Sequence, residues 1–182
     1  IRFPGFTAAW EQRKLGEITE SFSGGTPSVG TTRHYGGRIP FIRSGEISSD
    51  TTELFITEDG LNNSSAKMVK SGDILYALYG ATSGEVSISK IDGAINQAIL
   101  AIRSIENDDH YLVAQWLRMQ KEKIISTYLQ GGQGNLSGTI VKKLGIILPV
   151  NKEEQKLISK FLSNLDNLIT LHQHKLDSLK EF

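Results

Sequence analysis

The chain has 182 residues, of which 38% are hydrophobic and 22% charged, as is typical of a folded globular protein rather than a disordered one. It contains no cysteine, which excludes a disulfide framework and thiolate chemistry. Its net charge is zero, with 20 basic and 20 acidic residues, so the positive charge of most nucleic-acid-binding domains is missing. No apolar run approaches the roughly 20 residues of a membrane span, and we expect a cytoplasmic protein with no membrane contact.

The first 150 residues predict an α+β domain built on a glycine-punctuated, mostly antiparallel sheet. None of the 18 glycines follows Gly145, and short runs rich in Ile, Val, Leu, Tyr and Phe lie between them. This pattern is typical of strands separated by turns. We expect strands at residues 38–43, 73–79, 85–91, 95–103 and 139–148.

One or two helices are expected to pack on this sheet. Asp108 or Asp109 can accept hydrogen bonds from the free N–H groups of a first helical turn. Apolar residues then follow at near-helical spacing from residue 111 to residue 129. A shorter helix is expected over residues 59–68.

A long helix is predicted after Pro149. Asn151 is a suitable N-cap, and Glu154 three residues later fits a capping arrangement. Apolar residues then recur at alternating steps of four and three, with one polar exception: Ile158, Leu162, Leu165, Ile169, His172, Leu176 and Leu179. A helix of some 30 residues spans roughly 45 Å, which is longer than a small sheet domain. We therefore expect a sheet domain at residues 1–149 and a separate long helix at 150–182, whose distal half needs an apolar partner.

The sequence offers no site for catalysis. The four histidines lack metal-ligand spacing, so we expect no metal. No nucleophile elbow, phosphate-binding lysine loop or paired carboxylates are found, and the glycines at 131–134 lack the strand–turn–helix setting of a dinucleotide site. We expect a binding module without cofactors rather than an enzyme.

Four polar, glycine-flanked loops carry groups that suit base edges and phosphates. Arginine matches guanine or phosphate, glutamine and asparagine amides match adenine, and glycines allow close approach. The candidate DNA-binding residues are Thr26, Ser28, Arg33, His34, Tyr35, Arg43, Tyr79, Thr82, Ser83, Lys90, Gln130, Gln133 and Asn135. Structural alternatives exist: an ion pair of Arg43 with Glu46, core packing of Tyr79, and ordinary turns at the glycines.

Several short motifs, in order, resemble the specificity subunit of type I restriction–modification systems. The chain opens with RFPGF (residues 2–6) and WEQRKLGE (10–17) and continues with GGTPS (24–28), IPFIR (39–43) and GDIL (72–75). It then runs through Leu148-Pro149, EEQ (153–155), Ile158, Leu165-Asp166 and Ile169 into the long helix. The resemblance covers nearly the whole chain and about half of such a subunit.

The resemblance implies one target recognition domain and one spacer helix. In that family two recognition domains each read half of a split double-stranded DNA target, and paired helices fix their separation and dock methyltransferase subunits, which bring in restriction subunits. S-adenosylmethionine and ATP belong to those other subunits, so neither is expected here. The chain would be a fragment, or a half-length subunit that pairs with a second copy. The zero net charge departs from this reading and favours the alternative, a protein-interaction head on a dimerising helix.

Overall fold

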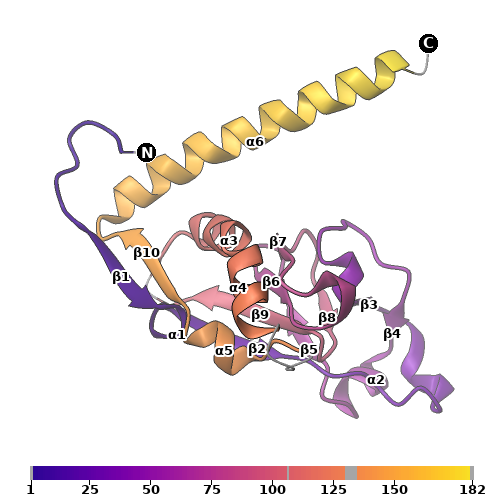
Figure 1. Cartoon of the computed structure of the whole chain (residues 1–182). Helices are drawn as coiled ribbons and strands as arrows, with labels where there is room; N and C mark the ends of the chain where they lie inside the picture. Colours follow the sequence, from indigo (N-terminus) through magenta and orange to yellow (C-terminus); the bar gives the residue numbers. More distant parts are fainter. Residues whose placement is uncertain (1, 106, 130–134, 181–182) are drawn as a thin grey trace.

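The computed structural model describes residues 2–105, 107–129 and 135–180. It consists of a mixed head and a long helix, α6 (Lys152–Lys180), which leaves the head and projects past it (Figure 1). Within the described part of the chain, no helix is both long enough and apolar enough to cross a membrane.

Two four-stranded sheets form the body of the head. The first is antiparallel and has the order β2 (Thr19–Ser23), β9 (Ile99–Ser104), β6 (Ile74–Ala77), β7 (Val86–Ile88). The second has the order β4 (Phe55–Ile56), β3 (Tyr35–Ile42), β8 (Gly93–Ile95), β5 (Lys67–Val69). In the second sheet β3 and β8 run parallel, with Ile42 beside Ile95, and the remaining pairings are antiparallel.

A two-stranded ribbon and several short helices complete the head. In the ribbon, β1 (Trp10–Lys14) pairs antiparallel with β10 (Gly145–Pro149), so the N-terminal segment lies at the base of α6 (Figure 1). The α-helices are α1 (Leu15–Ile18), α2 (Glu58–Asn62), α3 (His110–Met119), α4 (Lys121–Tyr128) and α5 (Gly138–Lys142). Three single turns are η1 (Thr32–His34), η2 (Ser44–Glu46) and η3 (Gly80–Thr82).

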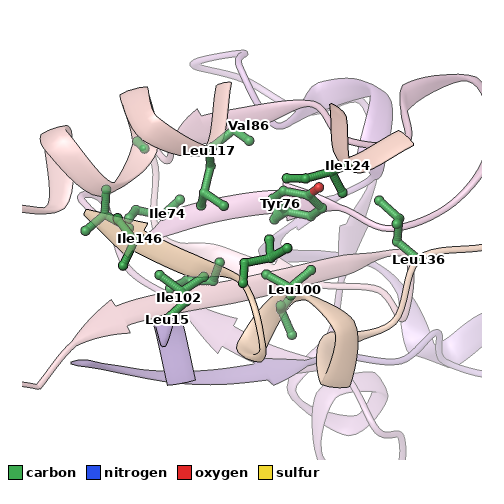
Figure 2. Packing of buried hydrophobic residues seen from close by; sticks show 14 of the residues in the cluster. Leu15, Ile74, Tyr76, Val86, Leu100, Ile102, Leu117, Ile124, Leu136 and Ile146 are labelled. Carbon is green, nitrogen blue, oxygen red and sulfur yellow. The ribbon is translucent and has the colours of Figure 1, made fainter. Parts of the chain in front are cut away.

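Strand β6 lies at the centre of the core because it is buried on both faces. Its alternate residues Ile74 and Tyr76 pack with Leu117 of α3 and Ile124 of α4 (Figure 2). The residue between them, Leu75, packs with Ala77 and with the second sheet's Ile42 and Ile95 in another cluster. The first sheet therefore lies between the helices and the second sheet, and this fixes the strand ends relative to one another.

The predicted α+β class with mostly antiparallel pairing is confirmed, and β3, β6 and β7 lie within or overlap the expected strands. The strand expected at 95–103 is confirmed over 99–103, where β9 lies, but it is not continuous back to residue 95. Asn96 interrupts it: its Oδ1 accepts from the N–H of Ala98 at 3.0 Å, which closes a turn between β8 and β9. The strand expected at 139–148 is also wrong in its first half, because the Ser137 hydroxyl caps the short helix α5 at the N–H of Ile140.

The helix predictions hold with local corrections. Asp109 caps α3 by accepting from Leu112 N at 3.0 Å, and the expected single helix breaks at Gln120 into α3 and α4. The helix expected at 59–68 is wrong beyond α2, because residues 67–69 form β5. The long helix and its Asn151 cap are confirmed: Asn151 Oδ1 accepts from the N–H groups of residues 153 and 154, at 2.9 and 3.2 Å.

Candidate nucleic-acid interface

The strands of both sheets bring their loops to one edge of the head. Strands β3 and β8 are parallel and both end there, at Ile42 and Ile95. Strand β6 ends at Ala77, opposite the first residue of β9, Ile99. We call the segments that meet at this edge the loop rim: residues 24–28, 43–48, 65–67, 78–85, 96–98 and 135–136.

Three hydrogen bonds join separate loops of the rim, and two of them are made at the 96–98 turn. The Thr26 hydroxyl donates to Gln97 Oε1 at 2.8 Å. The N–H of Leu78 donates to the carbonyl of Ala98 at 2.8 Å, and the N–H of Leu136 donates to the carbonyl of Leu78 at 3.1 Å. Two of the four loops expected from the sequence therefore bond the 96–98 turn, which lies in a segment expected to be a strand, and the 135–136 segment joins them through Leu78.

The remaining loop, η2, borders the same rim through a polar hollow of about 230 Å³. The hydroxyl-bearing residues Ser44 and Ser48 line it on one side, and Thr82 and Ser87 line it on the other. The lining is completed by Gly45, Ile47, Glu85 and Val86. Hydroxyl groups both donate and accept hydrogen bonds and so suit base edges, whereas the carboxylate of Glu85 does not favour a phosphate.

Arg43 is held by carboxylates of its own loop. Its guanidinium contacts Glu46 Oε1 and Glu53 Oε2, each at 2.7 Å, and its Nε contacts Glu46 Oε2 at 3.0 Å. The hydrogen bond from Arg43 lowers the pKa of Glu46 to about 2 against the opposing effect of burial, and the pKa of Arg43 rises. The structural alternative for Arg43, an ion pair with Glu46, is confirmed.

The predicted residues of the 78–85 loop serve partly to shape it. Ser83 is buried, and its hydroxyl donates to the carbonyl of Leu78 at 3.4 Å. Thr82 donates to the carbonyl of Tyr79 at 3.4 Å, while the half-buried Tyr79 side chain packs against the main core. Of the three predicted residues here, Thr82 reaches the polar hollow.

Arg33 and His34 lie away from the rim, at the other end of β3 beside α2. Arg33 Nε is 2.9 Å from Asp59 Oδ2, although its side chain is 76% exposed. The His34 side chain is buried, with Nε2 3.4 Å from the same carboxylate oxygen. The structure therefore separates these two residues from Thr26, although the sequence predicts all three in one polar loop.

The other predicted residues are divided between the rim and the rest of the head. The Tyr35 hydroxyl donates to the carbonyl of Pro27 at 2.6 Å, which ties the start of β3 to the first loop, where Ser28 is exposed. Lys90 is exposed but lies at the end of β7 away from η3. Asn135 is exposed on the rim, next to buried Leu136. Gln130 and Gln133 lie outside the described residues.

Two rim residues were missed by the sequence analysis. Gln97 is exposed at the centre of the rim, and the turn-forming Asn96 before it was the signal that could have revealed it. Lys67, the first residue of β5, lies opposite Ile95, is exposed, and has no acidic partner in the described part of the chain. The sequence does not reveal Lys67 because a helix is expected over residues 59–68.

A buried polar cluster attaches α6 to the head. Gln155 is 1% exposed, and its Nε2 donates to Asp108 Oδ1 at 2.7 Å and to the carbonyl of Pro149 at 2.8 Å. Its Oε1 accepts from the N–H of Asp109 at 2.8 Å. The first turn of α6 is thereby tied both to the start of α3 and to the end of β10.

The N-terminal segment contacts the first turn of α6 on the side opposite the Gln155 cluster. Glu154 is fully buried, and its Oε1 lies 3.4 Å from both Arg2 Nε and Trp10 Nε1. Phe3 meets Phe161 edge-to-face, with ring centroids 6.0 Å apart. The expected role of Glu154 in capping is therefore wrong, because its carboxylate turns toward the N-terminal segment.

The apolar stripe of α6 is covered only near the head. Ile158 is buried and Leu162 half-buried, whereas His172 is exposed. The exposed fractions rise along the helix: Leu165 40%, Ile169 55%, Leu176 58% and Leu179 64%. The distal half thus extends beyond the head with its apolar residues in solvent (Figure 1), as its length predicted.

The described residues contain no group of three or more His, Cys, Asp or Glu side chains that could hold a metal ion. The rim presents hydroxyl and amide groups together with the Arg43–Glu46 ion pair and Lys67, and the head that carries it is fixed to a long helix.

Comparison with known proteins identifies the family to which this chain is similar. The family model described as "Type I restriction modification DNA specificity domain" matches residues 8–181. The specificity subunit of the type I restriction enzyme MjaIX of Methanocaldococcus jannaschii is 30% identical over 171 residues, covering 88% of this chain and 38% of the relative. The HindI specificity subunit of Haemophilus influenzae is 29% identical over 178 residues, covering 88% of this chain and 37% of the relative.

Solved structures share the fold. The HsdS subunit from Thermoanaerobacter tengcongensis superposes with a TM-score of 0.68 at 18% identity, covering 95% of this chain and 42% of that one. The type I S subunit from M. genitalium gives a TM-score of 0.70 at 16% identity, covering 94% and 43%. The chain spans about two fifths of the length of the curated relatives it matches. On the strength of the family match, this chain belongs to the type I restriction–modification DNA specificity domain family.

Proposed function

We propose that this chain recognises one half of a split double-stranded DNA target for a type I restriction–modification complex. The observation that carries the proposal is the convergence of loops from both sheets on one rim, in a chain of the DNA specificity family. Residues 1–149 would act as the target recognition domain and residues 150–182 as the spacer. The polar groups of the rim would meet base edges and phosphates.

The length of the spacer helix would set the number of base pairs between the two halves of the DNA target. Helix α6 has 29 residues, about 43 Å at 1.5 Å per residue, which corresponds to about 13 base pairs at 3.4 Å each. Its distal apolar stripe would pack against a second spacer helix, either from the other half of a longer subunit or from a second copy. Because the head holds the first turns of α6 from two sides, the direction of the helix would set where the second head lies.

Catalysis and cofactors would belong to the partners. Methyltransferase subunits would bind S-adenosylmethionine, restriction subunits would use ATP, and this chain would direct both to the target in the cytoplasm. The partners would also supply most of the phosphate contacts, since many cations of this chain are already paired with carboxylates, among them Arg33, Arg43, Arg103 and Lys121.

A domain exchange tests the proposal. Residues 17–147 are replaced by the corresponding segment of a relative with another target, and the methylated motif of a cell carrying the complete system is sequenced before and after. We expect one half of the motif to change while the other half is retained. An unchanged motif would reject the proposal and favour the protein-interaction head.

A further inference from the structure

We propose that Gln97 is a base-reading residue of the rim, that its ligand is the major-groove edge of an adenine, and that Thr26 is its positioning residue. The inference rests on the proposed function and deepens it, because it names one contact and one base. It starts from an exposed amide held in a fixed place by a second loop, 71 positions earlier in the sequence.

Hydrogen bonds within the turn and buried residues on either side of it fix the backbone that carries Gln97. The turn is closed by Ile99 N donating to the carbonyl of Asn96 at 3.3 Å and by Ala98 N donating to Asn96 Oδ1 at 3.0 Å. The flanking residues Ile95 and Ile99 are both fully buried. Gln97 is thus an exposed side chain on a rigid turn, which is the support that a reading group requires.

The Thr26 hydrogen bond orients the amide. The hydroxyl donates to Oε1 at 2.8 Å, which identifies the oxygen side of the carboxamide and leaves its second lone pair open. No described residue accepts a hydrogen bond from Nε2, so the NH2 group is free to donate. One donor and one acceptor are therefore presented side by side on an exposed surface.

This pair of groups matches adenine. In the major groove adenine offers an acceptor at N7 and a donor at N6, and a glutamine amide satisfies both at once. Guanine offers two acceptors and cytosine one donor, so each leaves one group of the amide without a partner. A glutamine held in one orientation discriminates between these bases better than a freely rotating one, because its amide cannot turn to match another pattern of donors and acceptors; the smaller loss of conformational entropy raises its affinity.

Close packing of the first loop explains how Thr26 reaches Gln97. A Cβ at Gly24 would lie 1.8 Å from the carbonyl oxygen of Ile95, and a Cβ at Gly25 would lie 2.6 Å from the Cβ of Ser65. The loop thus lies directly against β8 and the segment before β5. Lys67, next to the same strand end and without an acidic partner among the residues described, is suitably placed for a neighbouring phosphate.

The test uses the complete system in a cell that has no other methyltransferase, with the methylated motif read by sequencing. For Gln97→Ala we expect discrimination at one A·T pair of one half-site to fall about 10- to 100-fold, with the other positions retained. Gln97→Glu should shift that position toward cytosine, because a carboxylate accepts from N4. Thr26→Val should weaken discrimination at the same position by a smaller factor, and the Thr26→Val/Gln97→Ala double variant should match Gln97→Ala alone.

Two controls separate the inference from general damage. Gln12→Ala removes an exposed glutamine from the β1–β10 ribbon, outside the rim, and should leave the motif unchanged. The urea midpoint of each purified variant should equal that of the parent, because the Gln97 side chain is exposed. An unchanged motif with Gln97→Ala, relaxation at several positions, or loss of methylation by a folded variant would each overturn the assignment. Failure of the proposed function itself would instead appear in the domain exchange, as a motif that does not depend on this chain.

Discussion

Tyr111 on α3 donates a hydrogen bond to Asp166 on α6, 55 positions further along the chain. Gln115, one turn later on α3, donates to the same carboxylate oxygen at 2.9 Å. Burial, followed by the hydrogen bond with Asp166, raises the pKa of Tyr111 to about 12, so its hydroxyl remains a donor at neutral pH. This pair lies farther along α6 than the Gln155 cluster and therefore adds a second point of attachment between the helix and the head.

Tyr111→Phe should widen the range of directions of α6 while leaving the head folded. The chain has no cysteine, so spin labels at Thr139→Cys in the head and Ser178→Cys in the distal helix can report their distance distribution. We expect a broader distribution and a loss of about 1 kcal/mol in the free energy of unfolding. Tyr76→Phe, which removes a buried hydroxyl with no described partner, is the matched control and should leave the distribution unchanged.

Gln155→Ala should be among the most destabilising substitutions on α6. It leaves Asp108 Oδ1, the carbonyl of Pro149 and the N–H of Asp109 without the amide that they contact. The expected loss is about 2–4 kcal/mol in the free energy of unfolding, measured by urea denaturation. Gln173→Ala on the exposed half of the helix should change that free energy by less than about 0.5 kcal/mol; equal effects of the two would contradict the role of the cluster.

The pKa of Glu46 predicts a specific acid sensitivity. Because its folded-state pKa, about 2, lies below the ordinary value of 4.5, its contribution is present above pH 4.5 and is lost as the pH falls toward 2. Solvent around the partly exposed Arg43 screens the pair, so we expect a contribution of about 1 kcal/mol. The free energy of unfolding, measured in urea across pH 2–7, should fall less steeply at acid pH for Glu46→Gln than for the parent. The variant Asp50→Asn, at an exposed position, should show the same fall as the parent.

Salt should affect DNA binding by the isolated chain only weakly. Each phosphate contact contributes a slope of about −0.9 to log K against log salt concentration. Since Arg43 and Arg33 are already paired with carboxylates while Lys67 is not, we expect a slope no steeper than about −2. Fluorescence anisotropy between 50 and 200 mM salt checks this value, and a slope near −5 would show that the chain neutralises many phosphates by itself.

Charges in the distal stripe of α6 should abolish helix pairing without unfolding the head. Leu176→Lys and Leu179→Lys place cations where the stripe is more than half exposed and where a partner helix would bury them, at a cost of several kcal/mol. Sedimentation should then show a smaller fraction of dimer, or of complex with the other half. His174→Lys, on the opposite face, should leave association unchanged.

The sequence predicted elements with a regular period and missed contacts between distant segments. Helix α6 was predictable because its stripe repeats over seven positions, and Asn151 marks its start. The turn at Asn96 was missed because Ile95 and Ile99 on either side are apolar core residues, which made the segment resemble one strand. The importance of Gln97 depends on Thr26, which reaches it only through the close packing of Gly24 on β8, and no local pattern encodes that contact.

The separation between buried strands and exposed strand ends has an evolutionary consequence. The residues that stabilise the head, such as Tyr76 and Leu75, lie within β6, whereas Gln97 and Thr26 lie outside regular strands. Substitutions in the loop rim can accumulate with little effect on folding. New preferences for DNA sequence can therefore arise by point mutation or recombination without a large loss of folding stability. Diversification should therefore be rapid at the turns and slow in the framework.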